Sequence, residues 1–137
     1  MAHVLDHLFH PAAAAVIGAS TDPDKIGGRP IHFTKRRGFA GRLYPVNARA
    51  SEVQGLPAFP DLTSIGEAVD CAIISVPAPA VPNAVEQCAD TGVKVAAVFS
   101  AGFAEIGADG AAAQARLVDI ARAGGVRLLG PNCMGAF

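Results

Sequence analysis

The chain has 137 residues, of which 51% are hydrophobic and 17% charged, a composition typical of one globular α/β domain with its own core. The formal net charge of −1 is far from the strongly basic balance of nucleic-acid-binding domains, so we expect no nucleic-acid partner. No apolar run reaches the roughly 18 residues of a membrane span, and no basic segment precedes an apolar stretch at the N-terminus. We therefore expect neither a membrane partner nor a secretion signal.

The three cysteines, Cys71, Cys88 and Cys133, lie far apart and form no C-x-x-C motif or cluster with histidine. This pattern argues against a disulfide framework and against a zinc site, so we expect no metal ligands and a reducing, cytoplasmic setting. No histidine stands near Cys133 in the sequence, and we interpret this cysteine as structural rather than as a catalytic thiol.

Apolar runs alternate with segments of helical periodicity along the chain. The expected strands, in chain order, are residues 13–18, 42–46, 71–76, 94–99 and 126–129. The expected helices are residues 30–37, a segment that starts near 81 and is closed by Gly92, and residues 110–123. Residues 51–69 are broken by glycine and proline and leave room for at most one short strand and one short helix. The fold class that this order predicts is α/β: a Rossmann-like, doubly wound, mostly parallel sheet with helices on both faces.

Ligands of such sheets bind beyond the carboxyl ends of the strands. The segments there are rich in Gly, Ser, Asn and Pro, and none contains a nucleophile–base pair or paired carboxylates, so we assign no catalytic residue. Charge also favours an anionic ligand at the first of these loops: Lys and Arg outnumber acids by seven to three in residues 1–50, whereas acids outnumber them by nine to four in residues 51–137. We interpret the triplet 35–37 as the solvated end of a helix.

The loop after the first strand, ASTDPDKIGG, is the best candidate for a phosphate or nucleotide site. Gly18 permits a tight turn, Ser20 and Thr21 offer hydroxyl groups, and we expect a helix that begins near Gly28 to point free N–H groups at the loop. About nine residues separate Gly18 from Gly28, too many for the tight G-x-G-x-x-G turn of dinucleotide sites.

The second strand ends in Asn47, Ala48 and Arg49, without the acidic residue that binds ribose hydroxyls in NAD sites. Arg49 suits an additional ribose phosphate, either the 2′-phosphate of NADP or the 3′-phosphate of coenzyme A. An exposed loop cation without a ligand is an equal alternative. After the third strand, Pro77 and Pro79 stiffen the loop into a shelf for an adenine ring or a pantetheine arm, or simply end the strand.

Five segments in order, AVIGAS…IGG, YPVN, SVPA, SAGFAE and LLGPNCMG, together resemble the N-terminal CoA-binding domain of NDP-forming acyl-CoA synthetases. This family includes ADP-forming acetate–CoA ligases and is akin to the succinyl-CoA synthetase α subunit. The resemblance runs from about Leu5 to Gly135 and implies that coenzyme A lies across the carboxyl ends of the strands. The CoA-binding residues that we predict are Gly18, Ala19, Ser20, Thr21, Lys25, Asn47, Arg49, Val76, Pro77, Ser100, Ala101 and Gly102.

The chemistry of this family uses an acyl phosphate, a phosphohistidine and an ATP-grasp domain. The resemblance implies that the phosphorylated histidine and that domain, with ATP or ADP and Mg²⁺, lie beyond Phe137. We therefore expect residues 1–137 to form a single CoA-binding domain, a fragment of a larger synthetase, whose partners are CoA and the remaining domains or subunits. Ala101 stands where succinyl-type enzymes carry an acid, which places the chain nearer the acetate type; the acyl substrate and an acetyltransferase-fused parent stay open.

Two other classes stay open. The first is an NAD(P)-binding Rossmann domain of an oxidoreductase, against which the missing acid and the long first loop both count. The second is a stand-alone CoA-binding regulatory module, which we would not expect to carry SAGFAE and GPNC together.

Overall fold

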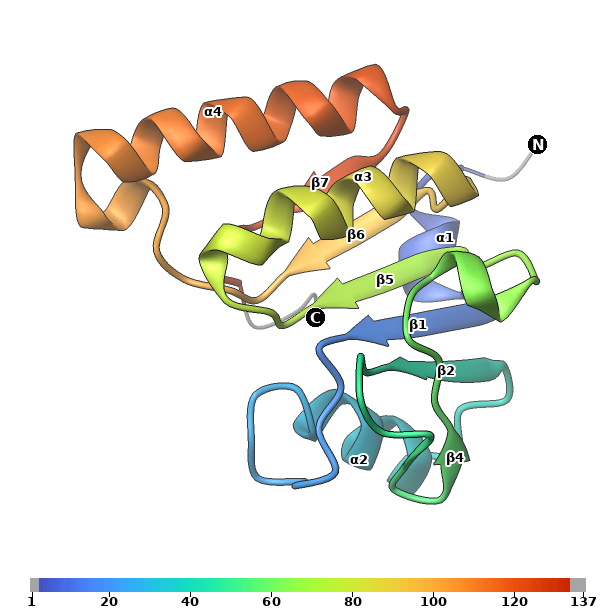
Figure 1. Cartoon of the computed structure of the whole chain (residues 1–137). Helices are drawn as coiled ribbons and strands as arrows, with labels where there is room; N and C mark the ends of the chain where they lie inside the picture. The colour runs from blue at the N-terminus through green and yellow to red at the C-terminus, as the bar shows by residue number, and fades with distance from the viewer. Residues whose placement is uncertain (1–2, 134–137) are drawn as a thin grey trace.

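The computed structural model describes residues 3–133, and a five-stranded parallel sheet forms its centre (Figure 1). The strands are β1 (Ala13–Ile17), β2 (Arg42–Val46), β5 (Cys71–Ile74), β6 (Val95–Val98) and β7 (Arg127–Leu129). Their order in the sheet is β2-β1-β5-β6-β7, and every neighbouring pair is parallel. All five predicted strands are confirmed, with ends that differ by one or two residues at most. Each reads as a nearly unbroken apolar run because helices bury both faces of a doubly wound sheet.

Helices cover the two faces unequally. The longer ones, α3 (Val81–Thr91) and α4 (Ala108–Ala123), lie side by side on one face, where they close the larger hydrophobic core (Figure 1). On the other face, Ile31 of α2 (Arg29–Arg36) packs on Val16 of β1 in a smaller core. The single turn α1 (Asp6–Phe9) borders the same face and was not predicted, because four residues carry no helical periodicity. No helix within residues 3–133 is long and apolar enough to cross a membrane.

The segment between β2 and β5 contains more structure than expected. Two short antiparallel strands, β3 (Glu52–Val53) and β4 (Leu56–Pro57), form a hairpin, and a 3-10 turn, η1 (Thr63–Ile65), follows. The hairpin turn has both central residues, Gln54 and Gly55, at positive φ, as a two-residue turn of type I′ requires. Only Gly55 signals such a turn in the sequence, because glutamine rarely adopts this conformation.

Cys71 of β5 and Cys88 of α3 are buried and free. Burial is the main cause that raises the pKa of the Cys71 thiol to about 11 and that of Cys88 to about 12. Both thiols are therefore protonated and unreactive at neutral pH.

Candidate functional site

The carboxyl ends of all five strands lie at one edge of the sheet, where the arrowheads in Figure 1 point the same way. A pocket of about 300 Å³ opens there between the loops that follow β1, β5 and β6. Its lining residues are Ile26, Ser75, Val76, Pro77, Ala78, Ser100 and Ala101. Four of the predicted CoA-binding residues therefore line one pocket.

The loop after β1 is packed tightly against β5. Gly18 has φ +85°, and a Cβ atom at this position would lie 2.9 Å from the carbonyl carbon and oxygen of Ser75. Its N–H and that of Ala19 both donate to the carbonyl oxygen of Val46, at 3.1 Å. Gly18 is thus required both by backbone conformation and by the close approach of β5.

The same loop is closed at its base by a backbone bond and braced by a distant side chain. The N–H of Ser20 donates to the carbonyl oxygen of Gly27 at 3.1 Å. The side-chain Nε2 of Gln54, in the β3–β4 turn, donates to the carbonyl oxygens of Ser20 at 2.9 Å and Gly28 at 3.0 Å. Gln54 therefore joins the start and the end of the loop, a role with no signal in the sequence around it.

The free N–H groups at this site belong to the loop itself and not, as expected, to the first turn of the helix. The N–H of Arg29, the first residue of α2, donates to the carbonyl oxygen of Lys25 at 2.9 Å, and Pro30 has no N–H. Instead, the backbone N–H groups of Thr21, Ile26 and Gly27 donate to no other group within residues 3–133. Free amides grouped in one loop form a binding surface for an anion.

Asn47 ties the loop after β2 to the loop after β1. Its side-chain Nδ2 donates to the carbonyl oxygen of Ala19 at 2.9 Å, and its Oδ1 accepts from the N–H groups of Arg49 and Ala50 at 2.8 Å. The side chains of Arg49 and Lys25 are exposed, and neither forms an ion pair with another described residue. Both cations are free to meet a phosphate, but neither lines the pocket.

Two serines with contrasting environments lie in the pocket wall. The hydroxyl of Ser100, a buried residue, donates to the carbonyl oxygen of Val76 and so joins the loops after β5 and β6. The Oγ atom of Ser75 is also buried, but it has no hydrogen-bond partner in the part of the chain that the structure describes. A buried hydroxyl without a partner is costly, and it is the group here that a ligand would satisfy. The prediction included Ser100 but missed Ser75.

Glu105 fixes the shape of the SAGFAE loop. Its Oε1 accepts from the N–H of Gly102 and, at 3.0 Å, from that of Phe103. These bonds hold the pKa of the Glu105 carboxyl below its ordinary value. Gly102 has φ +102°, and a Cβ atom there would lie 3.1 Å from the Cβ of Ala78. The predicted glycine therefore lies beside the pocket, held by an acid that the prediction did not include.

The GPNC turn closes the same edge of the sheet. The N–H of Asn132 donates to the carbonyl oxygen of Ser100 at 2.9 Å, and that of Cys133 donates to the carbonyl oxygen of Val98 at 3.3 Å. Gly130 has φ +96°, and a Cβ atom there would lie 2.5 Å from the Val98 oxygen. The last residues of the LLGPNCMG segment, Met134 and Gly135, lie outside the described residues.

These loops form a site that can bind but contains no reactive pair of side chains among residues 3–133. It offers backbone amides for phosphate, an apolar wall of proline and alanine, and one unsatisfied hydroxyl. This is the geometry of a nucleotide-binding domain of the doubly wound α/β class.

Residues 12–137 match the family described as the CoA binding domain, and the chain belongs to this family. It is 45% identical over 131 residues to the ADP-forming acetate–CoA ligase I of Archaeoglobus fulgidus, covering 96% of this chain and 19% of the relative. It superposes with a TM-score of 0.89 and 41% identity on the dinucleotide-forming acetyl-coenzyme A synthetase 1 of Ca. Korarchaeum cryptofilum, covering 93% of this chain and 28% of that one. A hypothetical protein of Pyrococcus horikoshii OT3, 20% identical with a TM-score of 0.74, shares the fold.

The chain is thus a CoA-binding domain related to the NDP-forming acyl-CoA synthetases. It spans about a fifth of the length of the Archaeoglobus ligase. The resemblance seen in the five sequence segments is confirmed.

Proposed function

We propose that coenzyme A binds across the carboxyl edge of the sheet, over the loops that follow β1, β2, β5 and β6. The observation that carries this assignment is a pocket lined by Ile26, Ser75 and Ser100, from three separate loops, in which the Ser75 hydroxyl has no hydrogen-bond partner among residues 3–133. The residues proposed to hold the cofactor are Gly18, Ala19, Ser20, Thr21, Lys25, Asn47, Arg49, Val76, Pro77, Ser100, Ala101 and Gly102, together with Ile26 and Ser75.

The loop after β1 suits the diphosphate of CoA. The free N–H groups of Thr21, Ile26 and Gly27 are donors to phosphate oxygens, and Lys25 adds an exposed positive charge. Arg49 is proposed to bind the 3′-phosphate, since its backbone is fixed by Asn47 while its side chain remains exposed.

The pocket suits the pantetheine arm, which is largely apolar but carries two amides. Pro77 and Ala101 supply apolar surface, and the hydroxyl of Ser75 supplies a partner for an amide or hydroxyl group of the arm. When bound, CoA supplies the thiol that accepts an acyl group, and this domain positions it.

We propose further that the ligation itself needs partner domains or subunits of an NDP-forming acyl-CoA synthetase. These would contribute the ATP-grasp domain, the phosphorylated histidine, ATP or ADP and Mg²⁺. The free, buried thiols of Cys71 and Cys88 fit a reducing cytoplasmic setting.

Isothermal titration calorimetry of the chain with CoA, 3′-dephospho-CoA, NAD⁺ and NADP⁺ tests the assignment. CoA should bind more tightly than dephospho-CoA, and Arg49→Ala should remove that difference, whereas Arg37→Ala, an exposed arginine at the end of α2, should leave it unchanged. Binding of a nicotinamide nucleotide without binding of CoA would contradict the proposal. Absence of binding by every ligand would contradict the claim that these loops suffice.

A further inference from the structure

Strand β7 forms an open edge of the sheet. Within residues 3–133 it pairs with β6 alone, and the N–H of Arg127 donates to the carbonyl oxygen of Lys94 at 2.9 Å. In a parallel ladder every second residue of a strand bonds to a given neighbour, so Arg127 and Leu129 face β6. The N–H and carbonyl of Leu128 therefore face outward, where no described residue bonds to them and another strand can pair with them.

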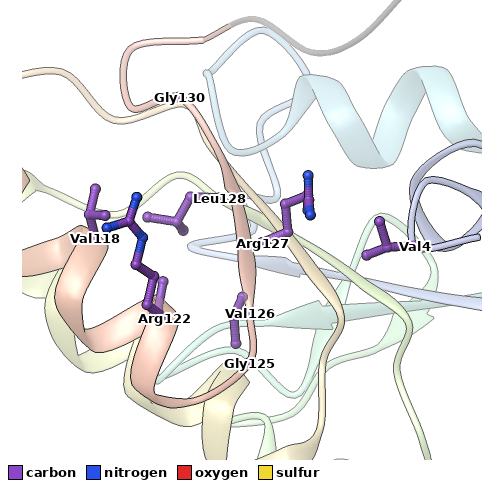
Figure 2. A pocket seen from close by; sticks show the side chains of 9 residues that line it. Val4, Val118, Arg122, Gly125, Val126, Arg127, Leu128 and Gly130 are labelled. Carbon is purple, nitrogen blue, oxygen red and sulfur yellow. The ribbon is translucent and has the colours of Figure 1, made fainter.

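A groove runs along this edge between β7 and α4. Its volume is about 560 Å³, it extends from Gly125 to Gly130, and it shares no residue with the pocket at the carboxyl edge. Figure 2 shows Val118 and Arg122 of α4 on one side of the β7 ribbon, and Arg127 and Val4 on the other. The groove therefore gives an added strand room for side chains on both faces of the sheet.

Two arginines give this groove its charge. The side chains of Arg122 and Arg127 are exposed, and neither forms an ion pair within the part of the chain that is described. Arg122 lies on the α4 side of the sheet, which is also the side on which Leu128 joins the core. Arg127 precedes Leu128 in β7, so its side chain faces the opposite side of the sheet. Successive residues of an added strand would meet one arginine and then the other.

We propose that the open edge of β7 accepts an extended, acidic polypeptide segment as a sixth strand, with adjacent carboxylates beside Arg122 and Arg127. The added strand would bond to the N–H and carbonyl of Leu128, the recognition mode known as β-augmentation. Its source is another domain of the synthetase, and this part of the inference rests on the proposed function. Relatives support that source, because the matching domain makes up only 19% of the Archaeoglobus ligase.

Charge disfavours a second copy of this chain as the occupant. If β7 paired in antiparallel fashion with β7 of a second copy, the Arg127 side chains of the two copies would lie close together along this three-residue edge. Like charges on facing strands repel each other. An acidic strand instead converts both arginines into ion-pair partners.

The test uses the 137-residue chain and a capped eight-residue peptide of alternating Thr and Val with two adjacent Glu at its centre. Peptide addition should slow amide hydrogen exchange at Leu128 and shift its NMR signals. The double variant Arg122→Glu/Arg127→Glu should weaken binding about tenfold and should prefer a peptide with two Lys in place of the two Glu. Arg36→Glu, an exposed arginine of α2 outside the groove, should bind like the parent chain.

Three results would overturn the proposal. Equal binding of the Glu and Lys peptides would show that Arg122 and Arg127 do not select an acidic strand. No protection of Leu128 by any peptide would show that the edge accepts no strand, and a β7-mediated dimer of the free chain would show that a second copy occupies it. Titration of the same samples with CoA reports on the separate loops at the carboxyl edge, so a chain that binds CoA but no peptide refutes the added strand alone.

Discussion

Gly18 lies directly against the carbonyl group of Ser75, so that a single added methyl group would approach its carbon and oxygen to 2.9 Å. This contact joins the end of β1 to the end of β5 and sets the floor of the proposed CoA site. The position combines a left-handed backbone with a backbone neighbour that has little freedom to move.

We expect Gly18→Ala to lower the free energy of unfolding by about 2–4 kcal/mol, since it adds left-handed strain and an overlap with β5. Gly38→Ala is the matched control, because Gly38 has φ +71° but, its chain neighbours aside, no heavy atom of residues 3–133 lies within 4 Å of its Cβ position. The control should lose only about 1 kcal/mol, through conformation alone. Urea unfolding of both variants measures the difference, and equal losses would show that the contact with Ser75 is unimportant.

Ser75→Ala should have opposite effects on stability and on binding. Removing a buried hydroxyl that has no hydrogen-bond partner among the described residues should raise the free energy of unfolding of the free chain by about 1 kcal/mol. The same change should weaken CoA binding about fivefold, because the bound cofactor loses a partner.

Ser100→Ala is the comparison, because the Ser100 hydroxyl already donates to the carbonyl oxygen of Val76. It should lower the free energy of unfolding by about 1 kcal/mol. Calorimetry and urea unfolding separate the two cases; a Ser75→Ala variant that is less stable than the parent would mean that this hydroxyl has a partner in the free chain.

Gln54→Ala should make the loop after β1 more mobile, although Gln54 is not among the residues proposed to contact CoA. Both bonds of its side-chain amide, to the carbonyl oxygens of Ser20 and Gly28, are lost, and we expect CoA affinity to fall about fivefold. Hydrogen exchange of the loop amides should accelerate at the same time. Gln87→Ala removes a glutamine of α3 that bonds to Leu62 and Asn83, far from this loop in sequence, and should leave CoA affinity unchanged.

Glu105 should make stability depend on pH. Because the folded chain lowers the pKa of this carboxyl, its contribution is complete above the ordinary pKa of 4.5 and is lost as pH falls through the folded value. The stability difference between the parent chain and Glu105→Gln should therefore be largest near neutral pH and should shrink as the pH falls below the ordinary value of the carboxyl. Urea unfolding at several pH values measures this difference, and a difference that does not change with pH would contradict the role of Glu105.

The cysteines should differ sharply in reactivity toward a thiol reagent at pH 8. Cys71 and Cys88 are buried with pKa values raised to about 11 and about 12, whereas Cys133 is only half-buried. Native protein should show one fast phase, which Cys133→Ser removes, and urea should expose the remaining thiols. A fast phase that survives this substitution would mean that one of the core thiols opens readily to solvent.

The sequence was informative where structure is set by continuous local patterns. The strands Ala13–Ile17 and Cys71–Ile74 were predictable because burial on both faces demands apolar residues at nearly every position. The loops at the carboxyl edge were predictable as well, because glycine, serine and asparagine follow each strand. The positions of these loops relative to one another depend on the order of the strands, which local patterns do not encode.

Residues that act across long separations were missed for that reason. Gln54 bonds to Ser20, 34 positions earlier, and nothing beside it marks this role. Ser75 stands out only because the packing of residues 3–133 leaves its hydroxyl without a hydrogen-bond partner there. Glu105 was visible within SAGFAE, but its function as an acceptor for Gly102 and Phe103 depends on the fold of the turn.

The loop of residues 18–28 therefore cannot keep its structure outside this domain. Its shape depends on Ser75 beside Gly18, on Asn47 beside Ala19 and on Gln54 between Ser20 and Gly28. A peptide of residues 12–30, or the same residues grafted onto an unrelated sheet, would lack all three supports and should not bind CoA. The site forms only when β5 and the β3–β4 hairpin have packed against this loop. CoA binding therefore also measures whether these distant parts of the chain have folded together.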